Sequence, residues 1–284
     1  MVNTDDIVDE VAKVNPLGSP AEYSSQYLPT LLFPIARKDK RNELGIESHP
    51  KFFGEDIWNA YEISWLNSNG LPQVAIGEFR FPASSPNIVE SKSLKLYLNS
   101  FNQTTFESKS AVEDIIRTDL SHETDSKVSV ALTNVDSPEH HAIEQLKADC
   151  VDTIDIKIDK YEYDPCLLEL EDGAKQEIVE ESLCSHLLKS NCLITNQPDW
   201  ASIFIEYNGQ KISRSSLLKY LVSFRTHNEF HEQCVERIYL DIMRLCQPKE
   251  LTVYARYTRR GGLDINPWRS NCVTSMRNIR LSRQ

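Results

Sequence analysis

The chain has 284 residues, which is enough to bury one large core or two cores of about 140 residues each. Its formal net charge of −11 argues against a nucleic-acid partner, since proteins that bind phosphate backbones carry basic stripes, so we expect a small-molecule substrate and no direct contact with nucleic acid. Seven cysteines without paired spacing or a Cys-x-x-Cys motif argue against a disulfide framework and a structural zinc site, and they predict reduced thiols in the cytoplasm.

Residues 1–50 are rich in Pro, Asn and Ser and predict an extended leader. The first residues lack the basic and apolar regions of a signal peptide. The chain contains no run of about 18 apolar residues, so we expect neither a membrane span nor a membrane partner.

A first module is predicted for residues 51–160. Alternating, aromatic-rich segments predict strands, and apolar residues at helical spacing predict two helices between them. A turn signal at 67–72 separates the first two strands. In chain order, the expected elements are strands at 57–65 and 74–81, helices at 93–101 and 110–117, and strands at 127–132 and 153–158.

A second module, residues 161–284, repeats this order. The segment Ser216 to Phe224 is identical to Ser93 to Phe101 at six of nine positions, which identifies an internal repeat. The expected elements are strands at 182–188 and 200–207, helices at 216–224 and 234–243, and strands at 251–257 and 272–277. Strands joined by short turns pair antiparallel. The expected fold class is therefore α+β, with two tandem modules that each hold an antiparallel four-stranded sheet and two helices packed on one face.

Cys192 and Asp199 form a candidate catalytic pair, because they flank a Pro-containing turn between two strand-like segments. A thiol attacks electrophilic carbon as the thiolate and needs an activating neighbour, and the intermediate that it forms needs a positioned acid. Asp199 can serve both needs. The spacing alone leaves a commoner alternative open, in which Cys192 is a small buried hydrophobe and Asp199 is only a turn residue after Pro198.

Glu90 and the pair His231-Glu232 stand at expected helix starts. A carboxylate at a helix start is also a common capping device, and a lone histidine is more often structural than catalytic. His231 and Glu232 can nevertheless both line the edge of a pocket at a helix terminus. His227, His231 and Cys234 are close in sequence, but no fourth ligand follows at metal spacing, so we expect no metal.

Four motifs together carry a resemblance to a known family. They are Glu90 to Tyr97, Cys192 to Trp200, Phe230 to Glu232, and Tyr257 to Arg269. With these motifs in this order, nearly the whole chain resembles the NADPH-dependent 7-cyano-7-deazaguanine reductases of queuosine biosynthesis in their long, two-module form. The Glu-Ser-Lys-Ser-Leu-Lys signature at 90–95 separates this family from the cyclohydrolase relatives that share its tunnelling fold.

The resemblance implies a reaction and assigns residues to it. The nitrile of the substrate would be reduced to the primary amine 7-aminomethyl-7-deazaguanine by two hydrides from NADPH, through a covalent thioimide on Cys192 and with Asp199 as the proton donor. The resemblance assigns substrate binding to Val89, Glu90, Ser91, His231 and Glu232, and NADPH binding to Ser91, Lys92, Arg260 and Gly261. No Gly-x-Gly-x-x-Gly motif is present, so the cofactor follows from the resemblance alone, and the cations have an alternative as ordinary surface charges.

Two other classes of protein remain open. In a cysteine hydrolase, Cys192 with Glu232 or Asp199 would process the nitrile with water, and NADPH absorbance would stay flat. In a non-catalytic purine-binding or assembly module, the ligand would bind without adding covalent mass. Because tunnelling folds close their sheets through oligomerisation, we also expect a homo-oligomer, in particular a homodimer.

Overall fold

The computed structural model describes residues 23–46, 50–138, 142–172 and 177–284. The chain divides into two compact units. Of the described residues, unit 1 holds 23–46, 56–138, 142 and 259–265, and unit 2 holds 50–55, 143–172, 177–258 and 266–284. These bounds differ from the expected divisions at residues 50 and 160, because segment 50–55 packs with unit 2 and segment 259–265 packs with unit 1.

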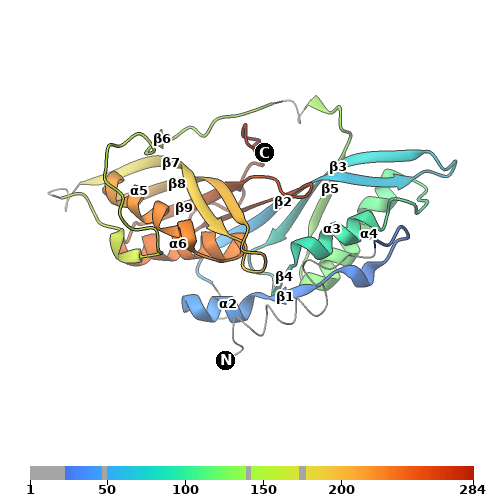
Figure 1. Cartoon of the computed structure of the whole chain (residues 1–284), viewed down its shortest axis with the longest axis horizontal. Coiled ribbons are helices and arrows are strands. Elements are labelled where there is room, and N and C mark those ends of the chain that lie inside the picture. Colours follow the sequence, from blue (N-terminus) through green and yellow to red (C-terminus); the bar gives the residue numbers. More distant parts are fainter. Residues whose placement is uncertain (1–22, 47–49, 139–141, 173–176) are drawn as a thin grey trace. The chain divides into compact units, whose positions relative to one another are not determined.

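Unit 1 is built on the neighbouring strands β5 (Ser129–Thr133), β3 (Pro72–Pro82) and β2 (Phe53–Leu66). Strand β5 pairs antiparallel with β3. Every second residue of β3 is buried, including Ala75, Phe79 and Phe81, as expected for a strand with one face on a core. Helices α3 (Ser91–Asn99) and α4 (Lys109–Thr124) cover that face, as Figure 1 shows.

A smaller pair of strands completes unit 1. Strand β1 (Pro34–Ala36) runs antiparallel to β4 (Asn87–Val89), and helix α2 (Arg37–Leu44) follows β1 directly. Helix α2 ends at Gly45, whose φ of 68° gives the left-handed cap that glycine adopts without strain. Strand β4 leads into α3, so this small sheet positions the start of that helix.

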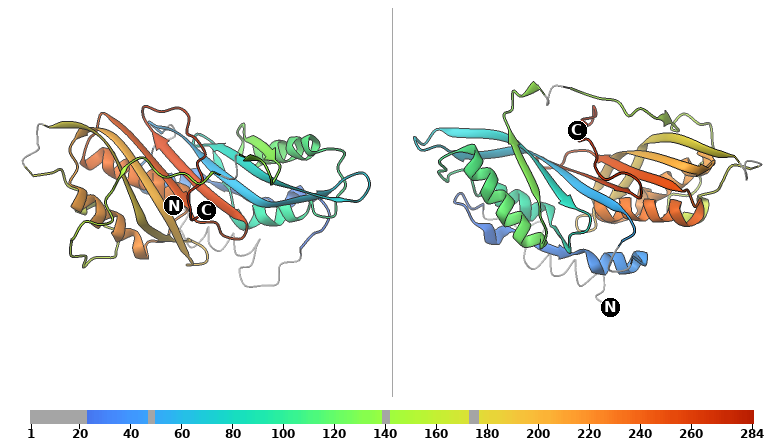
Figure 2. Two further views of the ribbon diagram at one scale, coloured as in Figure 1. Left: turned by 90° about the horizontal axis from the view of Figure 1, so that it is seen from above. Right: turned by 180° about the vertical axis from the view of Figure 1, so that it is seen from behind.

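Unit 2 contains the strand order β10-β9-β8-β7-β6. The strands are β6 (Asp149–Cys150), β7 (Ile178–Asn191), β8 (Pro198–Gln210), β9 (Glu250–Tyr257) and β10 (Leu263–Ser270), and the first three residues of β10 belong to unit 1. Strand β6 is parallel to β7, whereas β7, β8, β9 and β10 pair antiparallel. Helices α5 (Arg214–Ser223) and α6 (His231–Leu245) pack on one face of these strands (Figure 2).

The internal repeat is visible as the same side-chain network in both units. In unit 1 the Tyr97 hydroxyl donates to Asp119 Oδ2 at 2.6 Å, and in unit 2 the Tyr220 hydroxyl donates to Asp241 Oδ2 at 2.6 Å. In each case a tyrosine of the first helix of the unit meets an aspartate of the second helix. The two helix pairs are therefore joined by matching hydrogen bonds, as the repeated sequence leads one to expect.

A second tyrosine joins each network from the segment ahead of the helices. Tyr27 donates to the Asp119 carboxylate and Tyr163 donates to the Asp241 carboxylate, both at 2.7 Å. These tyrosines open the related sequences Tyr-Leu-Pro-Thr-Leu and Tyr-Asp-Pro-Cys-Leu, which form the 3-10 turns η1 (Pro29–Leu31) and η3 (Pro165–Leu167). Tyr27 and η1 thus belong to the repeat, and the described residues 23–46 are folded, so the expectation of an extended leader was wrong for them. Residues 1–22 and 47–49 of that leader lie outside the described residues.

Two predicted strands are absent from the described structure. Residues 153–158 form no strand; Ile154 and Ile156 are partly buried against the core of unit 2, so their alternating pattern reflects an extended segment lying on a core without a ladder partner. Residues 272–277 are also irregular. Strand β10 pairs with β9 in the position expected for residues 272–277. It was not predicted as a strand, and it contains Pro267, a residue uncommon inside strands.

The predicted helices at 93–101, 110–117, 216–224 and 234–243 and the other six predicted strands correspond to observed elements with shifted ends. The α+β class is thereby confirmed. Within the described residues, no helix is long and apolar enough to cross a membrane.

Candidate active site

Cys192 lies in the loop that closes the β7–β8 hairpin. Its backbone N–H donates to the carbonyl of Gln197 at 2.8 Å, and its carbonyl accepts from the N–H of Asn196 at 3.0 Å. Asn196 has a φ of 53°, a left-handed conformation that asparagine tolerates better than most residues. The Cys192 side chain is partly exposed. Its thiol is therefore attached to a held backbone and stays within reach of a small molecule.

Asp199 lies on β8, two residues after Gln197 and opposite Ser190 of β7. Cys192 is hydrogen-bonded to Gln197 just beyond the last ladder pair, Asn191 with Pro198, so Cys192 and Asp199 belong to the same end of the hairpin. Asp199 is only 2% exposed. The closed end of the hairpin thus carries both a buried carboxyl group and a reachable thiol.

The start of helix α6 is tied to the same end of the hairpin. Asn191, the last residue of β7, donates its backbone N–H to His227 O at 2.8 Å and accepts from Glu229 N–H at 3.0 Å. Side-chain amides extend the contact, from Asn191 to Asn228 and from Asn228 to Asn196, at 3.0 Å each. The segment before α6 therefore runs beside the Cys192 loop.

His231 and Glu232 are the first two residues of α6. The Nε2 atom of His231 lies 3.7 Å from Asp199 Oδ1, and its ring meets Tyr257 edge-on with centroids 4.1 Å apart. Glu232 is only 4% exposed, and the positive end of the helix dipole favours a carboxylate at this position. Unit 2 thus brings Cys192, Asp199, His231 and Glu232 to one end of its hairpin and helix.

A buried ion pair holds the segment that leads into α6. The carboxylate of Glu229 is 3% exposed. It accepts the Arg237 Nε–H at 2.9 Å on Oε1 and 3.1 Å on Oε2, accepts a further hydrogen bond from Arg237 Nη2, and lies 3.3 Å from His227 Nε2. The Arg237 guanidinium also lies over the ring of Tyr163, 4.9 Å from its centroid. Glu229 was not predicted as a site residue, because nothing in the sequence just ahead of a helix indicates an ion pair with Arg237 two turns further on.

Three of the other cysteines are poor nucleophiles. Burial raises the pKa of Cys234 to about 12, and the Glu229 carboxylate adds to this shift. Burial likewise raises the pKa of Cys184 to about 12 and that of Cys246 to about 11. Their thiols stay protonated at neutral pH, whereas nucleophilic attack requires the thiolate.

In unit 1, the predicted residues Val89, Glu90, Ser91 and Lys92 lie where β4 ends and α3 begins. Glu90 is the helix cap, since its carboxylate accepts from Lys92 N–H at 3.0 Å and from Ser93 N–H at 2.7 Å. Val89 and Glu90 are buried, Ser91 is exposed and Lys92 is half-buried. The capping alternative is therefore observed at Glu90, although a carboxylate has about four acceptor positions and capping uses two of them.

Arg260 and Gly261 belong to a two-residue hairpin in unit 1. Arg260 N–H donates to Leu263 O at 2.8 Å, and Leu263 N–H donates to Arg260 O at 3.1 Å. Gly261 and Gly262 between them have φ values of 57° and 80°, as a type I′ turn requires. A Cβ atom on Gly261 would lie 3.0 Å from Lys95 Nζ. The glycines are thus required by the turn itself, and the Lys95 ammonium group packs against it.

A surface cavity of unit 1 lies between this turn and α3. Its lining residues are Ala60, Glu62, Lys95, Leu98, Asn99, Gly261, Gly262 and Leu263. Lys92 precedes Lys95 by one helical turn and shares its side of α3. Of the charged residues, Lys95 and Glu62 line the cavity, and they form an ion pair with Nζ 3.6 Å from Oε2, while Lys92 and Arg260 belong to the helix and the turn on either side. Lys95 was not among the predicted site residues, although its spacing from Lys92 could have indicated it.

Comparison with known proteins identifies the class of this chain. Residues 23–132 match the family model described as "Nitrile reductase, 7-cyano-7-deazaguanine-reductase N-term", and residues 198–275 match the model described as "QueF-like protein". The second match begins within the hairpin that carries Asp199 and includes the start of α6. The matches define a protein of the nitrile reductase class.

Two relatives named NADPH-dependent 7-cyano-7-deazaguanine reductase resemble nearly the whole chain. The protein of Chromobacterium violaceum is 52% identical over 272 residues, covering 95% of this chain and 96% of its own. The protein of Cupriavidus pinatubonensis is 54% identical over 273 residues, covering 95% and 98%. This chain belongs to the NADPH-dependent 7-cyano-7-deazaguanine reductase family.

A solved structure, that of the archaeosine synthase QueF-Like in the apo form, is 17% identical and covers 34% of this chain and 95% of its own, with a TM-score of 0.30. At that level of similarity, it contributes nothing to the assignment.

Proposed function

We propose that this protein reduces the nitrile of 7-cyano-7-deazaguanine to the aminomethyl group with NADPH, as a step of queuosine biosynthesis. The observation that supports the proposal is that a reachable Cys192 and a buried Asp199 belong to the same end of the β7–β8 hairpin, in a chain that belongs to this reductase family.

The pair supports covalent capture of the nitrile. The sulfur of Cys192 adds to the nitrile carbon, a C–S bond forms as one C–N π bond breaks, and the nitrogen takes up a proton. Asp199 can accept the proton of the thiol and return it to the nitrogen, which becomes more basic as the carbon is reduced. NADPH, when bound, supplies the two hydrides that the complete reduction consumes together with two protons. The C–S bond breaks during the reduction, and the Cys192 thiol is regenerated.

Substrate recognition follows from the buried carboxylate of Glu232. An ionised carboxylate offers only acceptors, which suits the row of N–H donors along the edge of a deazaguanine. Because Glu232 is only 4% exposed, a ligand that leaves its carboxylate without a hydrogen-bond donor binds at a large cost in free energy. His231 is a further proposed substrate contact beside Asp199. On the resemblance, Val89, Glu90 and Ser91 of unit 1 are also assigned to the substrate.

The cationic residues of unit 1 fit the phosphates of NADPH in their donor chemistry. Lys92, Lys95 and Arg260 supply ammonium and guanidinium donors, and the Gly261 turn lets backbone approach a ligand without a side chain between them. The backbone N–H groups of Lys92 and Ser93 are held by Glu90, so the helix start itself is not the phosphate site. We assign NADPH binding to Ser91, Lys92, Arg260 and Gly261.

Intact-protein mass spectrometry tests the covalent step. Incubation with 7-cyano-7-deazaguanine and no cofactor should add the mass of the ligand to the wild type and not to Cys192→Ala. Asp199→Asn should lose turnover and form the adduct more slowly. An adduct that persists in Cys192→Ala, or that maps to another thiol, contradicts the assignment.

NADPH consumption distinguishes the reductase from the alternatives. Its absorbance should fall when the nitrile is present, with two NADPH consumed per amine formed. A flat absorbance with loss of nitrile would indicate a hydrolase, and binding without covalent mass would indicate a non-catalytic purine-binding module.

We also propose two tandem tunnelling-fold modules, a homodimer and a cytoplasmic location. Support for the modules comes from the repeated arrangement of strands with two helices on one face and from the matching tyrosine–aspartate networks. Analytical ultracentrifugation of the full chain tests the dimer, for which a single monomeric species would be the contrary result.

A further inference from the structure

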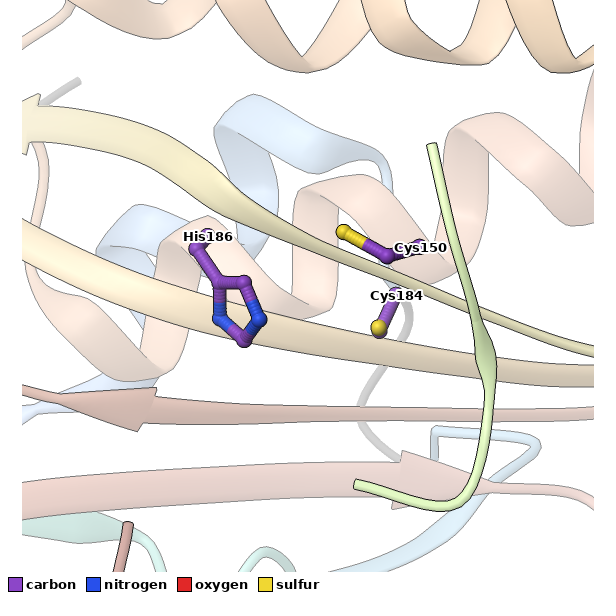
Figure 3. Close-up of side chains that lie close together, drawn as sticks. All are labelled: Cys150, Cys184 and His186. Atoms are coloured by element: carbon purple, nitrogen blue, oxygen red, sulfur yellow. The ribbon is translucent and has the colours of Figure 1, made fainter. Parts of the chain in front are cut away.

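Two thiols and an imidazole converge on strands β6 and β7, away from the proposed catalytic residues. Cys150 of β6 stands directly opposite Cys184 of β7 in the parallel pair, and His186 follows two residues later on the same strand. One ligand atom of each residue lies within 4.8 Å of those of the other two. Figure 3 shows the imidazole edge directed toward the two sulfur atoms.

This group is separate from Cys192. His186 precedes Cys192 by six residues along β7, which corresponds to about 20 Å at the usual rise of a strand. We propose that Cys150, Cys184 and His186 form a binding site for a zinc-like divalent cation, with three protein ligands and one open position. The spacing of cysteines and histidines along the chain predicted no metal, and the site proposed on β6 and β7 differs from that prediction. Cation binding there does not depend on nitrile reduction.

The donor set and its geometry fit zinc. Thiolate and imidazole are its preferred ligands. The Cys184 thiol is protonated without the ion, so binding of the cation displaces its proton to solvent. A tetrahedral site with bonds of about 2.3 Å to sulfur and about 2.0 to 2.1 Å to nitrogen places ligand atoms about 3.5 to 3.8 Å apart. The observed limit of 4.8 Å requires only a small contraction through side-chain rotation. Cys184 is buried, whereas Cys150 and His186 are exposed, so an ion can enter from solvent and keep a water ligand.

The surroundings orient the ligands as outer partners of metal sites commonly do. Asp152 accepts from Ser185 Oγ at 2.6 Å and from the backbone N–H of His186 at 2.8 Å. The Nδ1 atom of His186 lies 2.8 Å from Ser202 Oγ, which leaves Nε2 as the ligand nitrogen. The Asp152 carboxylate also supplies negative charge beside the thiols, as does Asp149, the other residue of β6.

A bound ion would hold β6 in place. Strand β6 has only two residues, and its ladder with β7 therefore has few hydrogen bonds. A cation shared between Cys150 and the two residues of β7 would link the segment after residue 143 to the sheet of unit 2. An ion bound here would thus act as a structural clip, with its open position available to water or to an external ligand.

Cobalt titration of the full-length, reduced, metal-free protein tests the site. The wild type should bind one Co²⁺ with the thiolate charge-transfer and intense d–d absorption of a tetrahedral site, and Zn²⁺ should displace it. Cys150→Ser and His186→Asn alter exposed side chains, so the fold should be kept, and each should weaken binding by about 10- to 100-fold or more, since outer partners alone are worth that much. Cys184→Ser should do the same if it folds.

Two controls make the result specific. Cys166→Ser removes an exposed thiol of the same unit, and Cys192→Ala removes the proposed nucleophile; both should bind Co²⁺ as the wild type does. Zn²⁺ should also slow alkylation of Cys150 and leave that of Cys166 unchanged, as peptide mapping would show. The proposal is overturned if the wild type shows no thiolate band with Co²⁺, or if Cys150→Ser binds Co²⁺ as tightly as the wild type. Formation of a Cys150–Cys184 disulfide on oxidation would not rescue it.

Discussion

Replacing Glu229 by alanine should destabilise unit 2 and loosen the start of α6. The carboxylate is 3% exposed and accepts hydrogen bonds from both Nε and Nη2 of Arg237, whose side chain is 16% exposed. Removing one partner of a buried pair costs about 3 to 5 kcal/mol, because the other charge stays buried without compensation. Since Arg237 retains some contact with solvent, we expect the lower end, about 3 kcal/mol, or roughly a 100-fold shift of the unfolding equilibrium.

Urea denaturation monitored by circular dichroism and fluorescence measures this change. Asp114→Ala is a matched control, since it removes a surface ion pair with Arg117 on α4 in which the aspartate side chain is 66% exposed. Such pairs contribute about 0.3 to 0.5 kcal/mol. If the two units unfold in separate transitions, only one of them should move in Glu229→Ala. The value of kcat/KM should also fall, because Glu229 hydrogen-bonds through its backbone to Asn191, beside the Cys192 loop.

A double variant separates the buried charge from other causes. In Glu229→Ala with Arg237→Met, no charge is left behind, so part of the lost stability should return. If Glu229→Ala unfolds at the same urea concentration as Asp114→Ala, the ion pair does not hold this segment. The reasoning about the start of α6 would then be refuted.

Three further predictions concern the substrate, the cofactor and pH. Glu232→Leu leaves ligand donors unpaired at a cost of about 1 to 3 kcal/mol, so nitrile affinity by titration should drop about tenfold or more; unchanged affinity would make Glu232 a helix residue only. Lys92→Ala and Arg260→Ala should lower the preference for NADPH over NADH by about 10- to 100-fold and spare adduct formation, whereas the neighbouring Arg259→Ala should leave the preference intact. Burial raises the pKa of Asp241, so the folded chain binds this proton more tightly than the unfolded chain, and the free energy of unfolding of the wild type should fall as pH rises through the shifted pKa. Over the same pH range Asp241→Asn should become more stable relative to the wild type in urea denaturation. An equal change of stability with pH in both proteins would contradict this.

The local elements and the candidate pair Cys192 and Asp199 could be proposed from the sequence alone. Helices α3 and α5 follow from the repeated apolar spacing, since a helix brings residues three and four apart onto one face whatever surrounds it. The hairpin that joins Cys192 to Asp199 could be predicted because a short turn between two strand-like segments forces them to pair. The motifs then identified the family.

The tertiary structure decided what depends on partners distant in the chain. Residues 153–158 alternate as a strand does, yet within the described part of the chain they form no ladder, and Ile154 and Ile156 pack against the core of unit 2. Glu90 proved to be a helix cap in a segment that motif analysis assigned to the substrate. Cys150 and Cys184 are 34 residues apart in sequence and meet only because β6 lies parallel to β7. The spacing of residues along the chain predicts contacts within one helical turn or one hairpin. Which distant strands pair depends on how all segments of the chain pack into the same sheets and cores, so it cannot be predicted from spacing.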